Sequence, residues 1–290
     1  MLFRSGGTIA LITGIYERLV GAIAALDPEE ALALLPLLPR LGDASARREL
    51  GDALTDMEVP FLLVLGMGVL TAVITVANLV EVAIHDYSGL TFAFFFGLIA
   101  ASVLVLFGEV SADTPGRIMA GVTGFAFAFV LSGQAQGNML PGGLAVMFVA
   151  GAVAICAMVL PGVSGSLILL TVGKYETMTG AVSATTDTLF AGEFGQAVDP
   201  LTTLVVFMFG ALVGILSFAR VVQWALDTYR AATLTFLVAL MAGALRAPAI
   251  RIADATPEWT VAAAVPLLVS GVVGAGLVLA LNAATGELDY

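Results

Sequence analysis

The sequence predicts an all-α, polytopic membrane protein formed by one membrane domain, residues 1–290. Its composition, its apolar segments and an internal repeat lead to this prediction. Sixty per cent of the residues are hydrophobic and 11% are charged, whereas a soluble globule has about 25% charged residues on average. A helix satisfies its own backbone hydrogen bonds in lipid, so uncharged segments of about 20 residues are expected to cross a bilayer as helices.

The apolar segments predict about seven spanning helices. Polar residues and Pro141-Gly142-Gly143 divide the longest apolar run, and a weaker stretch forms a short last span. The expected spans are Val59–Val80, Ser88–Gly108, 117–132, 143–160, Pro200–Ala219, Ala231–Leu245 and Trp259–Gly286. Residues 27–58 form a polar acidic loop, and the positive-inside rule places this loop and the Arg117 turn on the cytoplasmic side.

The charged and metal-ligating residues exclude several classes of protein. The formal net charge is −11, and every basic residue except Lys174 is an arginine. No basic patch is available to neutralise the phosphates of a nucleic acid. One cysteine, Cys156, and one histidine, His85, exclude a disulfide framework and a multi-histidine or thiolate metal site. We therefore expect no cofactor.

The internal repeat is visible when the chain is shifted by 159 residues, which places Ser5–Glu17 on Ser164–Glu176. A second register, shifted by 144, places Gly66 on Gly210 and the Leu-Thr-Phe at 90–92 on that at 234–236. These matches predict an internal duplication, with repeat one at 1–110 and repeat two at 161–250. Secondary transporters are commonly built this way, although channels and membrane enzymes also retain duplications.

The repeated motif predicts a broken helix with a Gly/Ser turn in each half, and residues 161–182 either return as a hairpin or cross the membrane. In the second copy, Pro161 ends a helix, Gly162 and Gly165 allow a turn, and Ser164 and Ser166 add hydroxyl donors. A break at membrane depth is tolerated where it lines a polar cavity, and its free N–H groups form an anion site. The alternative is a simple tight turn between two helices.

Two glutamates and three cations are the other candidate site residues. Glu17 and Glu176 follow the repeated tyrosines, and a carboxylate in a membrane segment could couple transport to protons. The alternative is an interfacial charge that ends a helix. Arg18 and Lys174 are neighbouring cations, and Arg220 is expected at the end of its span. Each could bind a phosphate, and Arg18 and Lys174 could instead pair with the glutamates.

The motifs resemble those of a known family. With Ser-Gly-Gly-Thr-Ile-Ala-Leu-Ile-Thr-Gly-Ile-Tyr-Glu-Arg-Leu at 5–19 and Leu-Pro-Gly-Val-Ser-Gly-Ser at 160–166, the chain resembles the polyprenyl-phosphate translocases of bacteria and archaea. The resemblance implies a multi-pass plasma-membrane flippase, not an enzyme, that returns undecaprenyl phosphate or an archaeal dolichyl-type phosphate to the cytoplasmic leaflet. It also implies two re-entrant hairpins, as in DedA-type proteins. The expected partners are this lipid and the membrane lipids, and no nucleic acid is expected. The sequence does not decide whether the chain forms a homo-oligomer.

Carried over by motif, the phosphate-facing positions would be Ser5, Gly6, Gly7, Thr8, Pro161, Gly162, Ser164, Gly165 and Ser166, with Glu17 and Glu176 as paired carboxylates. The first motif departs from the family pattern, because Leu2, Phe3 and Arg4 stand where the second copy has Pro-Gly-Val. We therefore expect that an upstream segment is missing from this chain.

Two other functions stay open. A carrier for a small anion or ion could use the same hairpins, and it would need an enclosed polar pathway. A membrane enzyme acting on lipid phosphates would need a nucleophile beside a base, and the single histidine argues against that function.

Overall fold

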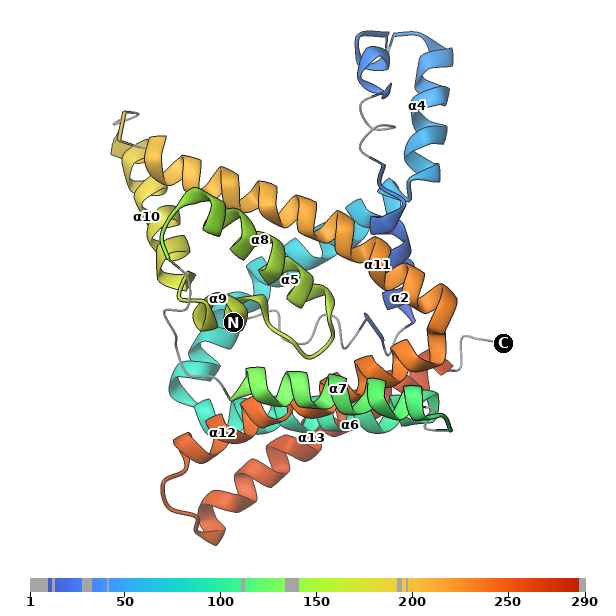
Figure 1. Cartoon of the computed structure of the whole chain (residues 1–290). Helices are drawn as coiled ribbons and strands as arrows, with labels where there is room; N and C mark the ends of the chain where they lie inside the picture. The colour runs from blue at the N-terminus through green and yellow to red at the C-terminus, as the bar shows by residue number, and fades with distance from the viewer. Residues whose placement is uncertain are drawn as a thin grey trace.

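The computed structural model describes residues 10–11, 14–27, 33–40, 42–110, 113–133, 141–191, 195–196 and 198–286, and its regular elements there are all helices (Figure 1). The helices are α2 Ile15–Ala24, α4 Ala44–Asp56, α5 Val59–Asp86, α6 Ser88–Leu106, α7 Pro115–Ser132, α8 Leu144–Val159, α9 Gly165–Thr171, α10 Tyr175–Ala191, α11 Val198–Ala244, α12 Arg246–Ala255 and α13 Val261–Gly286. Two short 3₁₀ helices, η1 Leu35–Arg40 and η2 Phe107–Glu109, complete the order.

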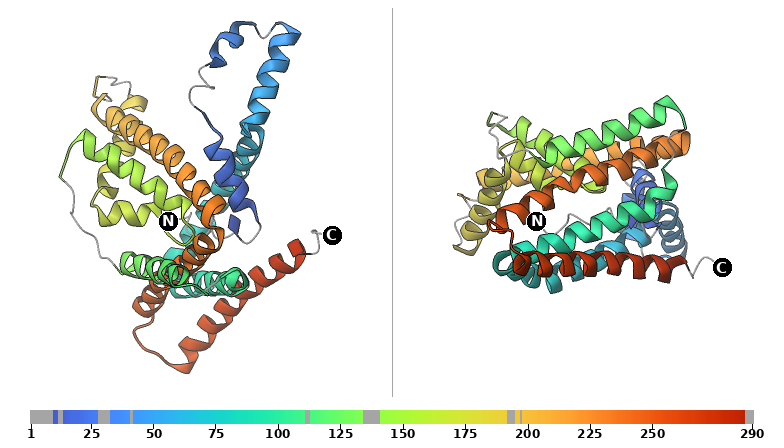
Figure 2. Two further views of the ribbon diagram at one scale, coloured as in Figure 1. Left: turned by 45° about the vertical axis from the view of Figure 1, so that its right-hand side comes forward. Right: turned by 90° about the horizontal axis from the view of Figure 1, so that it is seen from below.

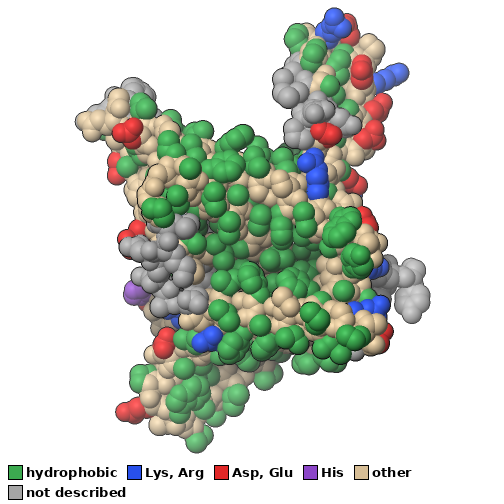
Figure 3. All heavy atoms as spheres, viewed as in Figure 1, with side chains coloured by type: hydrophobic (Ala, Val, Ile, Leu, Met, Phe, Trp, Pro, Cys, Tyr) green, Lys and Arg blue, Asp and Glu red, His purple; other side chains and the backbone are tan. Residues whose placement is uncertain are grey.

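Four helical segments in the described ranges are long and apolar enough to cross a membrane. They are α6, α7, the continuous stretch Val198–Ala255 and α13, and a fifth is added if α4 and the start of α5, bent by 68°, count as one span. Figure 3 shows hydrophobic side chains gathered over α7, α8 and α11, with charged side chains toward the edges of the molecule and on α4. Large side chains such as Leu104, Leu268 and Val272 are about 70% exposed, as expected for surfaces that contact lipid.

The predicted polar segment 27–58 is partly helical. It contains η1 and α4, and α4 projects away from the other helices (Figures 1 and 2). Only Ala46 of α4 is buried, so this helix lies outside the main core.

Helix α11 bends at Tyr229, whose φ of −133° and ψ of 44° are not helical, and Figure 1 shows its second arm returning beneath the first. The first arm runs to Thr228, so the helix continues past Arg220, where the predicted span Pro200–Ala219 ends. Arg220 lies within the helix, where its guanidinium donates a hydrogen bond to the Leu26 carbonyl at 3.0 Å. The long arginine side chain reaches a polar partner while its stem lies along the helix, so the charge need not end the span.

The junction of α5 and α6 has the same local geometry as this bend. Tyr87 has φ −130° and ψ 43°, close to the values of Tyr229. At each break a threonine hydroxyl from the following helix donates to a carbonyl of the preceding turn, and the Ala83 carbonyl also accepts the Tyr87 N–H at 3.1 Å. The threonine hydrogen bonds run from Thr91 Oγ1 to the Ala83 carbonyl, 2.7 Å, and from Thr233 Oγ1 to the Ala225 carbonyl, 3.0 Å.

The helices cross closely at glycines. A Cβ at Gly274 of α13 would overlap the Phe94 carbonyl of α6, and one at Gly124 of α7 would overlap the Phe236 carbonyl of α11. Gly210 brings the first arm of α11 equally close to α8. Apolar packing gives little association energy in lipid, so close backbone contact through small residues is the usual substitute.

The largest buried core lies where α2 meets both arms of α11. Its centre contains side chains at most 1% exposed, namely Tyr16, Val20, Ala219, Leu237 and Met241. A second cluster places Val163 and Ile168 of the α8–α9 hairpin against Ala128, Leu240 and Ala244. Helix α2 and the α8–α9 hairpin therefore pack against the same part of the second arm of α11.

Candidate functional site

The turn between α8 and α9, called the α8–α9 hairpin here, has the local backbone geometry that Pro161 and Gly162 predict. Helix α8 ends at Val159, Leu160 is extended with ψ 125°, and Pro161 is fully buried. Gly162 has φ +85°, and a Cβ there would lie 3.1 Å from the Met241 Cα. The turn requires a glycine both for its backbone conformation and for its close approach to α11.

The serines of the hairpin lie beside each other. Ser164 is buried and immediately precedes α9, and its Oγ lies 2.8 Å from the Ser166 Oγ. Each hydroxyl has one proton, so a pair that shares one hydrogen bond still has a second proton to donate. A Cβ at Gly165 would press on the Ala154 carbonyl and the Met158 side chain. The first-copy positions Ser5, Gly6, Gly7 and Thr8 lie outside the described residues.

The next part of the motif has the same backbone form in both copies. Gly173, with φ +68°, follows the end of α9. The next residue, Lys174, donates its N–H to the Leu169 carbonyl at 2.8 Å, as in a Schellman cap. Gly14 has φ +69°, and its N–H donates to the Leu11 carbonyl at 3.3 Å. A left-handed glycine thus lies two residues before each Tyr-Glu pair, at 16–17 and at 175–176.

The two glutamates are not brought together. Glu17 lies in the first turn of α2 and accepts a hydrogen bond from Arg230 Nη2 at 2.8 Å. Glu176 lies in the first turn of α10, is exposed, and forms no ion pair within the described ranges. Figure 1 shows α2 and α10 on opposite sides of the molecule.

The three predicted cations occupy separate places. Arg18 pairs with Glu58 at 3.0 Å, and its guanidinium lies 4.4 Å from the Phe61 ring centroid. Arg220 holds the Leu26 carbonyl, and Lys174 is buried after α9 without an ion pair in the described part of the chain. Arg18 and Arg220 therefore fasten α2 and the chain after it to neighbouring helices.

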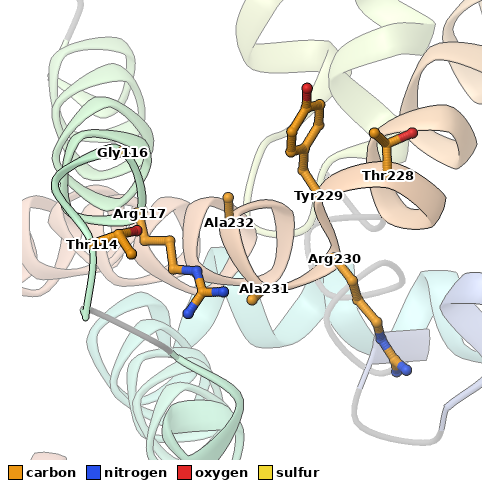
Figure 4. Close-up of a pocket in the computed structure, with 8 residues that line it drawn as sticks. All are labelled: Thr114, Gly116, Arg117, Thr228, Tyr229, Arg230, Ala231 and Ala232. Carbon is orange, nitrogen blue, oxygen red and sulfur yellow. The ribbon is translucent and has the colours of Figure 1, made fainter.

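A cavity that the sequence did not predict lies between the start of α7 and the bend of α11. It has a volume of about 310 Å³. Figure 4 shows two arginines among its lining residues, which are Thr114, Gly116, Arg117, Thr228, Tyr229, Arg230, Ala231 and Ala232. Sequence reasoning used Arg117 only to assign a membrane side and overlooked Arg230. The available signal was the position of Arg230 at the break between two expected spans.

A second cavity adjoins the first, because Tyr229 and Ala232 line both. Its volume is about 360 Å³, and nearly all its lining is apolar. The other residues that line it are Ala120, Leu160, Phe218, Val221, Val222, Ala225, Thr233, Phe236 and Leu237. Leu160 is the residue before Pro161, so this cavity extends from the bend of α11 to the beginning of the hairpin.

The long apolar helices define a multi-pass membrane protein of the helical-bundle class. The chain belongs to the undecaprenyl phosphate translocase-like family, whose model matches residues 4–266. This confirms the family that the motifs resemble.

Two relatives with assigned names are similar to the chain. A polyprenyl-phosphate transporter of Vibrio cholerae is 34% identical over 241 residues, which cover 83% of this chain and 70% of the relative. A polyprenyl-phosphate transporter of Staphylococcus aureus is 27% identical over 196 residues, covering 64% and 66% of the two chains. Both relatives are named as transporters rather than as enzymes. No solved structure matches the chain at a significant level.

Proposed function

We propose that this protein is a plasma-membrane flippase that moves a polyprenyl phosphate, such as undecaprenyl phosphate or an archaeal dolichyl-type phosphate, toward the cytoplasmic leaflet. The match of residues 4–266 to the translocase-like family carries the proposal, and the Vibrio cholerae relative supports the same substrate class. A lipid phosphate needs protein shielding only for its head group, because its tail stays in the bilayer. This fits a chain with so few charged residues.

An inverted duplication is part of the proposal. The helix breaks at Tyr87 and Tyr229 support it, because both have the same backbone angles and the same threonine-to-carbonyl bond. They correspond at a shift of 142 residues, rather than the 144 that the Leu-Thr-Phe letters suggest. Helix α5 and the first arm of α11 run in opposite directions in Figure 1. Close helix crossings also correspond, Phe94 with Gly274 and Phe236 with Gly124.

Inverted repeats give a transporter two conformations of similar energy, each open to one side. In this proposal the hairpins hold the phosphate between the two openings. Ser164 and Ser166 support that role, because their hydroxyl groups lie beside each other at the turn and can donate a hydrogen bond to an anion. The first-copy residues Ser5–Thr8 would form the matching half. Glu17 and Glu176, on opposite sides of the molecule, would each exchange protons with one aqueous phase.

A phosphatase-protection assay tests the proposal. The full chain is reconstituted into sealed vesicles that contain a polyprenyl phosphate in both leaflets, and a phosphatase that cannot cross the bilayer is added outside. Flipping exposes the inner-leaflet lipid, so nearly all phosphate should be released, whereas protein-free vesicles should release only the outer-leaflet share. Release limited to the outer leaflet with folded protein present would contradict the proposal. Uptake of inorganic phosphate by the same vesicles would support the small-anion carrier instead.

A further inference from the structure

The arginine-lined cavity has unused hydrogen-bonding capacity. Arg117 donates through Nη1 to Asp113 at 2.6 Å, and Arg230 donates through Nη2 to Glu17 at 2.8 Å. A guanidinium has five N–H donors, and neither arginine forms a further side-chain hydrogen bond in the described part of the chain. Both can therefore bind another anion while part of each fork remains on its carboxylate. Figure 4 shows the two guanidinium groups extending to the same side of the second arm of α11.

The residue between the two cavities separates polar from apolar surroundings. Tyr229 lines both cavities, and Figure 4 shows its ring directed away from the two guanidinium groups. On the ring side, Phe218, Val222 and Leu237 form part of an apolar wall. Val221 and Tyr229 are more than half exposed, so this cavity opens at the molecular surface. The pair of cavities thus joins a cationic end to an apolar end.

We propose that these two cavities form one binding site for a polyprenyl phosphate, distinct from the hairpin, on the side of the membrane where α7 begins. Arg117 and Arg230 bind the phosphate, and the apolar cavity takes the first isoprene units. The identity of the tail rests on the proposed function. Leu160 places the inner end of this site beside the hairpin, so the lipid can move between the two along α11.

Glu17 has a specific consequence at this site. The Glu17 carboxylate occupies Nη2 of Arg230 and neutralises part of its charge, so it weakens the attraction of this guanidinium for a phosphate bound to the remaining N–H groups. The repeated glutamate of the first half therefore opposes lipid binding here. Glu17→Gln should tighten binding, because the neutral amide holds the arginine less strongly. Weaker binding by Glu17→Gln would overturn this part of the inference.

Trp224 provides a reporter within the protein. Its ring centroid lies 5.8 Å from that of Tyr229, and the other tryptophan, Trp259, can be replaced by Phe. Farnesyl phosphate, farnesol and inorganic phosphate are titrated separately into the full chain in lipid nanodiscs while Trp224 fluorescence is recorded. Farnesyl phosphate should bind most tightly. Equal affinity for inorganic phosphate would reduce the site to a free-phosphate site and overturn the lipid assignment.

Two variants and a matched control test the arginines. Arg117→Gln and Arg230→Gln should each weaken farnesyl phosphate binding about tenfold or more, since each removes a charge-assisted hydrogen bond. Arg251→Gln, an exposed arginine of α12 outside both cavities, should bind like the unchanged protein. The ion pairs lost are partly exposed and contribute little to stability, so the variants should fold. Unchanged affinity in both cavity variants would overturn the site.

A cavity-filling variant tests the apolar half separately. Ala225→Phe should weaken farnesyl phosphate binding and leave any weak inorganic phosphate binding unchanged. If it affects neither ligand, the tail does not occupy this cavity. Arginine-dependent binding without flipping in vesicles would refute the proposed function and leave this site in place. Flipping by a protein whose binding ignores both arginines would refute the site alone.

Discussion

Gly274→Ala in α13 tests the close helix crossings on which the fold depends. An added Cβ would lie closer than 3.0 Å to the Phe94 carbonyl of α6, a separation that real Cβ atoms do not show. The two helices must therefore move apart, and overpacking of this kind costs about 1–3 kcal/mol. Alanine also favours a helix over glycine by about 1 kcal/mol, which offsets part of the loss.

A control in the same helix removes that offset. A Cβ at Gly276 would meet nothing within 4 Å, so Gly276→Ala gains the helix preference without the clash. The free energy of unfolding, measured in detergent by circular dichroism, should therefore be lower for Gly274→Ala than for Gly276→Ala by about 1–3 kcal/mol. Gly124→Ala in α7 should lose a similar amount, because its Cβ would meet the Phe236 carbonyl. Equal stability of Gly274→Ala and Gly276→Ala would refute the crossing.

Three further changes have defined outcomes. Tyr16→Phe should leave the free energy of unfolding unchanged or raise it by up to about 1 kcal/mol, because the buried hydroxyl has no hydrogen-bond partner in the described part of the chain. Burial also raises the pKa of Tyr16. The native state therefore loses stability as the pH rises above about 10, where the unfolded tyrosine ionises. Thermal melts of Tyr16→Phe should show less of this alkaline loss of stability, and an unchanged loss would contradict the role of Tyr16. Ser164→Ala should slow flipping several-fold with little change in melting temperature, and an unchanged rate would remove the hairpin serine from the site. Glu176→Gln should abolish the dependence of flipping on an imposed pH gradient, and a dependence retained at full size would exclude proton coupling through this residue.

The sequence predicted the features that have strong local causes. Pro161 and Gly162 impose the turn after α8 through restricted or left-handed backbone angles. Uncharged segments predicted the positions of α6, α7 and α13 within a few residues. Arg220 was misleading because a single charge was interpreted as a helix end, whereas the Leu26 carbonyl satisfies it inside α11.

The arginine cavity depends on contacts that no local pattern signals. Arg117 and Arg230 are far apart in the chain and share a cavity only because α7 packs on the second arm of α11. That packing follows from Gly124 and from the bend at Tyr229, and the bend lies between two apolar stretches without a proline to mark it. The family resemblance also directed attention to the repeated motifs, and Arg230 lies outside them.

The rate at which a polyprenyl phosphate crosses sealed vesicles that contain only this protein is the most direct test of the account. Release of nearly all the lipid phosphate by external phosphatase, with an unchanged rate for Arg251→Gln and a reduced rate for Arg230→Gln, is the predicted result. Release that stops at the outer-leaflet share, from vesicles shown to contain folded protein, would contradict the account.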